Sequence, residues 1–274
     1  MATSPAHMPL VSCLMVTADR PALCRRAIRC YNRQTYPNRE LVVVEDSTTD
    51  LAPVLADVPA GELVHRHVNP DRDLSLGALR NLSLEAARGD LLTQWDDDDW
   101  YHRERVAHQV AALHDGYDAC CLHGALMHVA SPRMMQHPYI GYLPDGVPGT
   151  IMHRRNASIR YPELARAEDS VFLKAWPETR RVQLPREASH LFIRCYHGDN
   201  TWEKTHFLTR MRNTPRDFLL YAWHRFVRGD LFGHPRFQLY PEARAAFVQY
   251  LEDSVALGLF APSEVCASPF ATTS

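Results

Sequence analysis

The stretch LLTQWDDDDW, residues 91–100, constrains this chain more than any other. It opens with an apolar run typical of a buried strand and ends in four consecutive aspartates, Asp96–Asp99. Adjacent carboxylates repel one another unless solvent or a cation relieves the repulsion. An isolated acidic run is usually a solvated turn, but open α/β sheets bind ligands beyond the carboxyl ends of their strands. The position therefore favours a site, and we expect Trp95 and Trp100 to be half-buried in its walls.

Apolar runs alternate with helical patterns along the first half of the chain. Strand patterns occupy residues 10–16, 41–44, 63–68, 91–95, 119–129 and 191–196. Helical patterns occupy residues 23–31, 75–88, 106–113, 168–176, 215–228 and 241–257. The order strand, helix, strand in the first 45 residues is a βαβ unit, which predicts a parallel sheet. We expect Asp19 to cap the first helix, with Pro21 in its first turn.

Prolines and glycines crowd residues 131–150. Residues that interrupt helices and strands so often predict a long loop or lid, and long irregular segments are often functional. His137 and Tyr139 would then close over a bound molecule, although an ordinary surface loop is an equal alternative. Gly149 and Thr150 would begin the strand that follows the loop, or let the backbone approach a ligand.

Bulk composition is that of an ordinary globular protein, with 46% hydrophobic and 23% charged residues among 274. A net charge of −2 without a long basic block argues against a nucleic-acid partner. The seven cysteines include no CxxC pair, which favours reduced thiols. Because we find neither a signal-peptide pattern nor an apolar run of spanning length, we expect a cytoplasmic protein.

Four ordered motifs resemble family 2 glycosyltransferases of the GT-A fold. VSCLMVTADRP, ELVVVEDSTTD and SLGALRNLSLEAARGDLLTQWDDDDW resemble the nucleotide-sugar lobe of that family, and RAEDSVFLKAW resembles the segment with its catalytic base. The resemblance implies a Rossmann-like α/β fold with a mixed, mainly parallel sheet flanked by helices. It divides the chain into a nucleotide-sugar lobe (9–130), an acceptor and catalytic lobe of the same domain (131–205) and a helical C-terminal extension (206–274).

The resemblance also implies a nucleotide-binding set. Its members here are Thr17, Asp19, Arg20, Asp46, Arg80, Asn81, Asp96 and Asp97. Asp46 matches the carboxylate that accepts a hydrogen bond from the base N–H, usually of uracil, so a UDP-sugar donor is favoured. Arg80 and Asn81 match residues that face the ribose and diphosphate. The chain departs from the family in having Glu45 before Asp46 and no aromatic residue after Thr17.

The predicted cofactor is Mn²⁺ or Mg²⁺, because such ions take oxygen ligands and bridge carboxylates to substrate phosphates. Asp98 is the first choice of ligand, with Asp96 beside it. Asp99 is the alternative, since a four-residue run leaves the register uncertain by one. His197 resembles a histidine that some family members add from the far side of the site; a structural histidine is the alternative.

Asp169 matches the catalytic base of the family, and Glu168 would orient it or contact the sugar. Both also lie at an expected helix start, where acidic residues are favoured by the helix dipole. One base opposite the leaving group implies a single displacement with inversion. We therefore predict a metal-dependent inverting glycosyltransferase whose acceptor is unknown.

Two other functions stay open from the sequence. A nucleotidyltransferase acting on sugar phosphates would share the metal and the sheet, although its Gly-rich start is absent. A non-catalytic nucleotide-sugar-binding protein would not need Asp169. The apolar faces of the last helices predict core packing, or else a homodimer or a peripheral membrane contact near Arg225 and Arg228.

Overall fold

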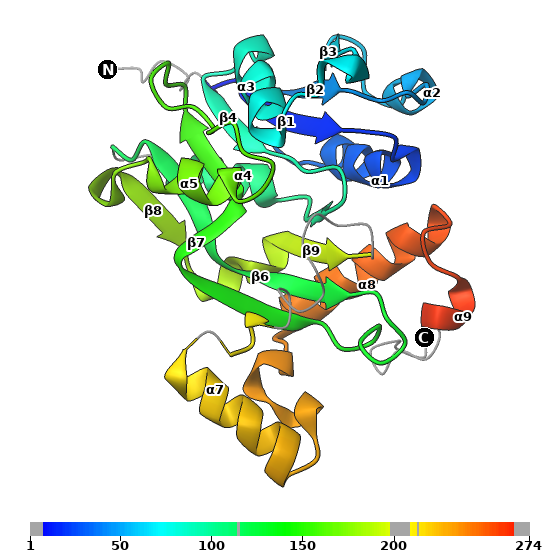
Figure 1. Cartoon of the computed structure of the whole chain (residues 1–274), viewed down its shortest axis with the longest axis vertical. Coiled ribbons are helices and arrows are strands. Elements are labelled where there is room, and N and C mark those ends of the chain that lie inside the picture. The colour runs from blue at the N-terminus through cyan, green and yellow to red at the C-terminus, as the bar shows by residue number, and fades with distance from the viewer. Residues whose placement is uncertain (1–7, 114–115, 198–208, 213, 266–274) are drawn as a thin grey trace, which may run out of the picture.

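The computed structural model describes residues 8–113, 116–197, 209–212 and 214–265 (Figure 1). The strands are β1 (Val11–Thr17), β2 (Arg39–Glu45), β3 (Leu63–His67), β4 (Leu91–Gln94), β5 (Trp100–Tyr101), β6 (Ala119–Val129), β7 (Tyr139–Arg154), β8 (Arg181–Leu184) and β9 (Phe192–Tyr196). The helices are α1 (Pro21–Asn32), α2 (Ala52–Leu55), α3 (Leu76–Ala86), α4 (Arg105–Ala112), α5 (Glu168–Lys174), α7 (Pro215–Ala222), α8 (Pro241–Ala256) and α9 (Pro262–Val265), with a π-helical turn at Trp223–Val227.

The strands form one mixed sheet in the order β3-β2-β1-β4-β7-β6-β9-β5, with β8 beside β6. Strands β3, β2, β1 and β4 run parallel, as do β6 and its partners β8 and β9, whereas β7 is antiparallel to both β4 and β6. The predicted mixed, mainly parallel sheet is therefore confirmed. So is the βαβ unit, with Pro21 in the first turn of α1.

Side chains of β1 alternate between two layers of core. Cys13 and Met15 pack in the larger cluster with α1, α2, α4 and α8, while Leu14 belongs to a second cluster with α3 and α5. This alternation follows from the two-residue period of a strand, and burial on both faces is usual for parallel strands. The direct parallel pairing of β1 with β4 places their carboxyl ends next to each other.

The predicted loop or lid at 131–150 is wrong from residue 139 onward, whereas residues 131–138 form the turns that connect β6 to β7. Residues 139–154 form β7, which pairs antiparallel with β6 over most of its length. Register shifts on β6 fall between Cys120 and Leu122 and between Leu122 and Gly124, opposite Pro144 and Pro148. Bulges tolerate prolines because no ladder hydrogen bond is required there. Gly149 and Thr150 accordingly lie inside β7 and do not begin it.

The two aromatic residues predicted to close over a ligand have packing roles. Tyr139 is fully buried, and the ring of His137 stacks on Phe232 with centroids 3.5 Å apart. The half-buried position predicted for Trp95 and Trp100 is also wrong, because both are fully buried. The two indole N–H groups donate to the Ala27 carbonyl and to Asp253, respectively. A buried indole N–H needs such a partner, and these contacts supply it.

Helices α7 and α8 of the C-terminal segment differ in how they pack against the rest of the protein. Helix α8 contributes Ala243, Phe247 and Tyr250 to the larger core cluster. Helix α7 instead projects from the end of the molecule, below the sheet in Figure 1. None of the helices in the described part of the chain has the length and apolar content needed to cross a bilayer. The division into three segments stays a prediction.

Candidate active site

A cleft opens at the carboxyl ends of β1 and β4, the position predicted for a ligand. Its wall is dominated by charged side chains. The carboxylates are Asp96, Asp97, Asp98, Asp99, Glu168 and Asp169, and the arginines are Arg20, Arg80, Arg166 and Arg194. The aspartate run is therefore not an isolated solvated turn. The structure brings it together with the acidic pair that begins α5.

Asp97 is fixed by two residues at the end of β1 and just after it. Thr17 Oγ1 donates a hydrogen bond of 2.6 Å to Asp97 Oδ2, and Arg20 Nη2 lies 2.7 Å from Asp97 Oδ1. The Asp97 side chain is only 1% exposed, and this burial raises the pKa of Asp97 to about 7 against the opposing charge of Arg20. Three of the predicted nucleotide-binding residues thus form one hydrogen-bonded group at the cleft.

Asp19 does not cap α1, so that prediction is wrong. Arg20 occupies the N-cap position without a side-chain cap. Asp19 has a left-handed backbone, with φ of 52°, and its carboxylate accepts hydrogen bonds from the backbone N–H groups of Thr48 and Thr49 at 2.9 and 2.7 Å. These bonds lower the pKa of Asp19. The carboxylate ties the loop after β1 to the loop after β2.

Asp46 carries an open acceptor. Its Oδ1 is buried and has no hydrogen-bond partner within the described residues, and burial raises the pKa of this carboxyl group. A buried acceptor without a partner costs free energy, which a donor N–H from a ligand would recover. The geometry therefore suits the base-binding role predicted for Asp46.

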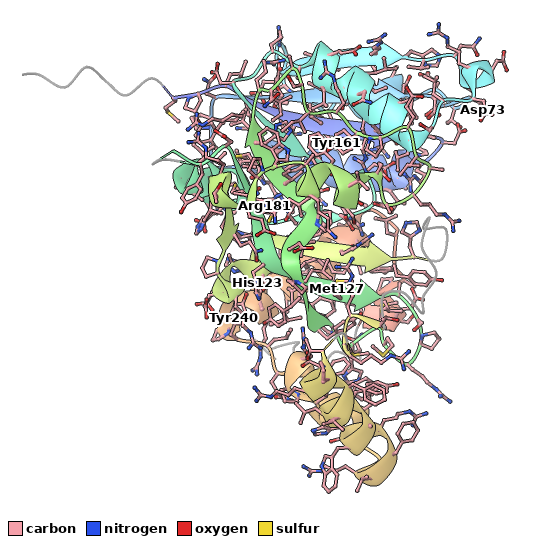
Figure 2. The ribbon with its side chains drawn as sticks, turned by 60° about the vertical axis from the view of Figure 1, so that its left-hand side comes forward. Asp73, His123, Met127, Tyr161, Arg181 and Tyr240 are labelled. Carbon is pink, nitrogen blue, oxygen red and sulfur yellow. The ribbon has the colours of Figure 1, made fainter. Side chains whose placement is uncertain are left out.

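Arg80 and Asn81, adjacent on α3, point to different places. Arg80 Nε donates to Glu168 Oε1 at 2.9 Å, and Arg80 Nη2 donates to Asp96 Oδ1 at 2.8 Å. The amide of Asn81 instead bonds the backbone N–H and carbonyl of Tyr161, the residue labelled in Figure 2, and lines a separate surface pocket. The nucleotide-binding role of Asn81 stays a prediction, and this placement does not support it.

Asp98 lies next to His197, the residue predicted to bind a metal ion with it, and that shared role stays a prediction. His197 Nε2 and Arg20 Nη1 lie 3.4 and 3.3 Å from Asp98 Oδ2. Burial works against ionisation of Asp98, but the hydrogen bond from His197 and the charge of Arg20 lower its pKa to about 2. Asp99, the alternative ligand, also lines the cleft, and its Oδ1 accepts a hydrogen bond of 2.9 Å from the Cys195 backbone N–H.

The donor set fits a hard divalent cation that shares its shell with a substrate. Within the described residues no group of three His, Cys, Asp or Glu side chains forms a self-contained metal site. Asp98 and His197 offer an ionised oxygen and an imidazole nitrogen, whereas the carboxylate of Asp96 is held by Arg80 and by Gln94 Nε2 at 2.8 Å. Mg²⁺ sites commonly combine one or two protein ligands with substrate phosphates and water.

Glu168 and Asp169 begin α5, as predicted. Ala167 precedes them in a left-handed conformation, with φ of 61°, which turns the chain into the helix. Glu168 is buried against Arg80, and burial raises its pKa. Asp169 lies at the cleft and its Oδ1 accepts a hydrogen bond of 2.6 Å from the Ser170 backbone N–H. The carboxylate of Glu168 is thus held by the Arg80 guanidinium group, and the carboxylate of Asp169 faces the cleft.

Three arginines of the site were missed by sequence reasoning. Arg166 and Arg194 line the cleft, and Arg26 of α1 donates to the Asp98 backbone carbonyl at 2.6 Å. Arg26 lies among apolar residues on the buried side of α1. Because a buried guanidinium group needs a hydrogen-bond acceptor, this position was the only sign in the sequence that Arg26 binds a distant group. The partner itself lies 72 positions away and has no local signature.

Known proteins resemble this chain in sequence and in fold. A glycosyltransferase of Haemophilus influenzae described as uncharacterized is 22% identical over 209 residues, which cover 69% of this chain and 80% of that protein. The putative glycosyltransferase EpsH of Bacillus subtilis is 33% identical over 92 residues, and that match spans 34% of this chain and about a quarter, 27%, of EpsH.

Among solved structures, the mannosyltransferase PcManGT from Pyrobaculum calidifontis, in complex with GDP-Man and Mn²⁺, superposes with a TM-score of 0.51 at 17% identity. The superposition covers 97% of this chain and 85% of PcManGT, and it supports the predicted GT-A fold. The family model described as "Glycosyl transferase family 2" matches residues 12–157, more than half of the chain. The chain therefore belongs to glycosyl transferase family 2 and is a glycosyltransferase.

Proposed function

We propose that this enzyme transfers a sugar from a nucleoside-diphosphate donor, with a UDP-sugar favoured, to an acceptor hydroxyl group, using Mn²⁺ or Mg²⁺ and inverting the anomeric centre. The observation that carries the proposal is the meeting of Asp98 and Asp169 in one cleft, with the Arg80 guanidinium bridging Asp96 and Glu168 between them. Carboxylates from two segments that are far apart in the sequence thus line the same cleft.

The diphosphate would lie at the aspartate run. Asp98 and His197 would hold the divalent ion, which when bound neutralises charge on the leaving diphosphate. Arg20 and Arg194 add positive charge at the same cleft. The Mn²⁺ in the PcManGT complex supports a divalent ion, without deciding between Mn²⁺ and Mg²⁺.

Asp169 would act as the base. Its carboxylate faces the cleft and is oriented by the Ser170 backbone N–H and hydroxyl group, at 2.6 and 3.2 Å. A base so placed removes the proton of an acceptor hydroxyl as it attacks. Glu168 is engaged by Arg80 at 2.9 Å and would orient the site without attacking the sugar. With Glu168 held by Arg80, Asp169 is the carboxylate that we assign as base, and we assign no nucleophilic carboxylate among the described residues, which supports inversion.

Asp46 would select the nucleobase of the donor. Its buried Oδ1 is an acceptor without a partner among the described residues, so it suits uracil N3–H. Guanine also presents N–H donors, and PcManGT was solved with GDP-Man, so a nucleotide panel is the direct test. Thermal stabilisation by UDP exceeding that by GDP, and lost in Asp46→Ala, is the expected result.

The central experiment compares Asp169→Asn with Asp145→Asn, a matched change at an exposed carboxylate outside the cleft. We expect release of nucleoside diphosphate from the donor with Mn²⁺, none with a chelator, and a loss of about 10²–10⁴-fold in Asp169→Asn alone. Donor binding should persist in both variants. Equal turnover in the two variants would remove Asp169 from the mechanism.

The same assay separates the other two functions. Pyrophosphate release from a nucleoside triphosphate and a sugar phosphate would indicate a nucleotidyltransferase. Donor binding without turnover by the wild-type chain would indicate a nucleotide-sugar-binding protein. The anomeric configuration of the product, read by NMR, tests inversion.

A further inference from the structure

The outer face of α7 and of the π-helical turn that follows it is strongly apolar. The exposed fractions are 52% for Phe218, 68% for Leu219, 54% for Trp223, 76% for Phe226 and 64% for Val227. The other exposed large apolar side chains in the described part of the chain, Met8, Leu164 and Val171, lie on separate segments. Contiguous exposed apolar surface marks an interaction site. We call these five residues the α7 stripe.

The π-helical turn keeps the α7 stripe straight. Leu219, Trp223 and Val227 of the stripe recur every four positions, and in a regular α-helix such a repeat rotates by about 40° per turn. The Arg228 backbone N–H bonds the Trp223 carbonyl, five residues back, at 2.9 Å. This wider turn holds more residues than an α-helical turn and so offsets the rotation. Phe226 and Val227 therefore stay in line with Phe218 and Leu219.

The opposite side of α7 anchors it to the protein. Tyr221 packs against the cluster that contains Met211 and Phe237. Asp217 pairs with the buried Arg236 at 2.6 Å. The stripe therefore faces outward on a fixed helix, and Figures 1 and 2 both show this helix projecting at the end of the molecule, away from the sheet.

Positive charge is concentrated in the same segment of the chain as the α7 stripe. Arg212, Arg216, Arg225 and Arg228 are exposed there. Of the two acidic residues in the same segment, Asp217 is neutralised by Arg236, and Asp230 accepts a hydrogen bond from the Gly233 backbone N–H. An apolar face with Trp and Phe, flanked by arginines, is the composition of a helix that lies in the interface of an anionic membrane.

We infer that α7 and the π-helical turn form a membrane-surface element, with the α7 stripe inserted among the acyl chains and the four arginines on the phosphates of anionic phospholipids. A second copy of the chain fits less well. In a two-fold dimer the same patch faces itself, which would bring the arginines of both copies together. This inference does not depend on the donor or on the catalytic base.

Vesicle flotation with the full chain tests the inference. We expect the wild-type protein to float with vesicles of phosphatidylcholine containing about 30% phosphatidylglycerol, to bind phosphatidylcholine alone at least tenfold more weakly, and to be released by about 0.5 M salt. Arg225→Glu and Arg228→Glu should each reduce binding by roughly fivefold or more. The pair Phe226→Ser and Val227→Ser should abolish it.

Matched controls lie on other surfaces. Leu164→Ser and Arg72→Glu change an exposed apolar and an exposed basic residue elsewhere, and should leave binding unchanged. Trp223 emission should shift to shorter wavelength with anionic vesicles, and Trp223→Phe should remove that shift. Donor turnover and melting temperature in solution should be the same in the stripe variants as in the wild type.

Three results would overturn the inference. One is the absence of vesicle binding by the wild-type chain. Another is equal binding by the wild type and the stripe variants. The third is a concentration-dependent dimer, seen by sedimentation without vesicle binding, that is lost in Phe226→Ser with Val227→Ser; this result would assign the stripe to a second copy.

Discussion

Arg26 Nη2 donates a hydrogen bond of 2.6 Å to the backbone carbonyl oxygen of Asp98. The same guanidinium group donates to Ser254 Oγ at 3.2 Å and lies over the ring of Tyr250, 5.2 Å from its centroid. Helices α1 and α8 thus support the loop of Asp96–Asp99, here called the aspartate loop, on the side away from the cleft. The position of the proposed metal ligand depends on a residue that does not line the cleft.

Replacing Arg26 with methionine tests this support. The change leaves the buried carbonyl of Asp98 without its donor, so we expect a loss of about 1–3 kcal/mol in the free energy of unfolding. The Mn²⁺ concentration needed for half-maximal turnover should rise as well. Denaturant unfolding and a metal titration measure the two effects. Arg25→Met is the control, because Arg25 is 43% exposed and pairs with Asp57 at 3.6 Å. Equal effects of both changes would refute a specific role for Arg26.

Arg80→Lys should impair turnover although the charge is kept. Arginine reaches Glu168 and Asp96 with separate nitrogens, at 2.9 and 2.8 Å, and a single ammonium group cannot reproduce that fork. We expect kcat to fall at least tenfold. Arg88→Lys is the control, since Arg88 pairs with Glu40 at 2.6 Å but is 59% exposed and lies outside the cleft. Steady-state kinetics of both variants measure the effect. A normal kcat in the Arg80→Lys enzyme would count against a role for the Arg80 contacts to Glu168 and Asp96.

The left-handed backbone at Ala167 predicts a steric effect next to the catalytic pair. Ala167→Val should cost about 1–2 kcal/mol in the free energy of unfolding, because a β-branched residue is strained at a φ of 61°, whereas Ala167→Gly should be neutral or stabilising. Ala175→Val, at the other end of α5 with φ of −68°, is the matched change. Denaturant unfolding of the three variants gives the answer. If the valine costs the same at 167 and 175, strain is not the cause.

A buried histidine predicts acid sensitivity. His128 bonds Tyr250 Oη and the Met135 carbonyl, at 2.8 and 2.9 Å, and burial lowers the pKa of His128 to about 4. In the unfolded chain a histidine has a pKa of about 6.5, so between these values only the unfolded state binds the proton. The stability that this histidine contributes is complete above about pH 6.5 and is lost as the pH falls toward 4.

The loss assigned to His128 should approach about 3 kcal/mol at pH 4. Urea unfolding at several pH values should show a shallower pH dependence in His128→Gln than in the wild type. His108→Gln, at a side chain that is 49% exposed, should leave the slope unchanged. Identical slopes in all three proteins would exclude His128 as a source of the acid sensitivity.

The sequence was most informative where local pattern and tertiary structure agree. The runs before Thr17 and Asp96 are buried on both faces, as parallel strands usually are, and each begins with apolar residues, so the position of the cleft beyond their ends could be predicted. The acidic pair before an apolar helical pattern likewise placed Glu168 and Asp169 at the start of α5. These signals span a few residues each.

The rest required long-range information. Pro144 and Pro148 produce the local signature of a loop, but the irregular pairing of β7 with β6 absorbs them. Asp19 has the residue type of a helix cap, yet the loop of Thr48 and Thr49 competes for its carboxylate. Local patterns do not show which distant group a polar side chain will bind.

The bonds between α8 and the two residues that flank or support the aspartates, Trp100 and Arg26, have a practical consequence for shortening the protein. Residues 12–157 match the family, but they contain neither Asp169 nor the Asp253 and Ser254 that hold Trp100 and Arg26. A fragment cut at the family boundary would keep every aspartate of the loop and lose the groups that brace it. A minimal active version of this enzyme must therefore run to the end of α8, beyond the segment that the family model matches.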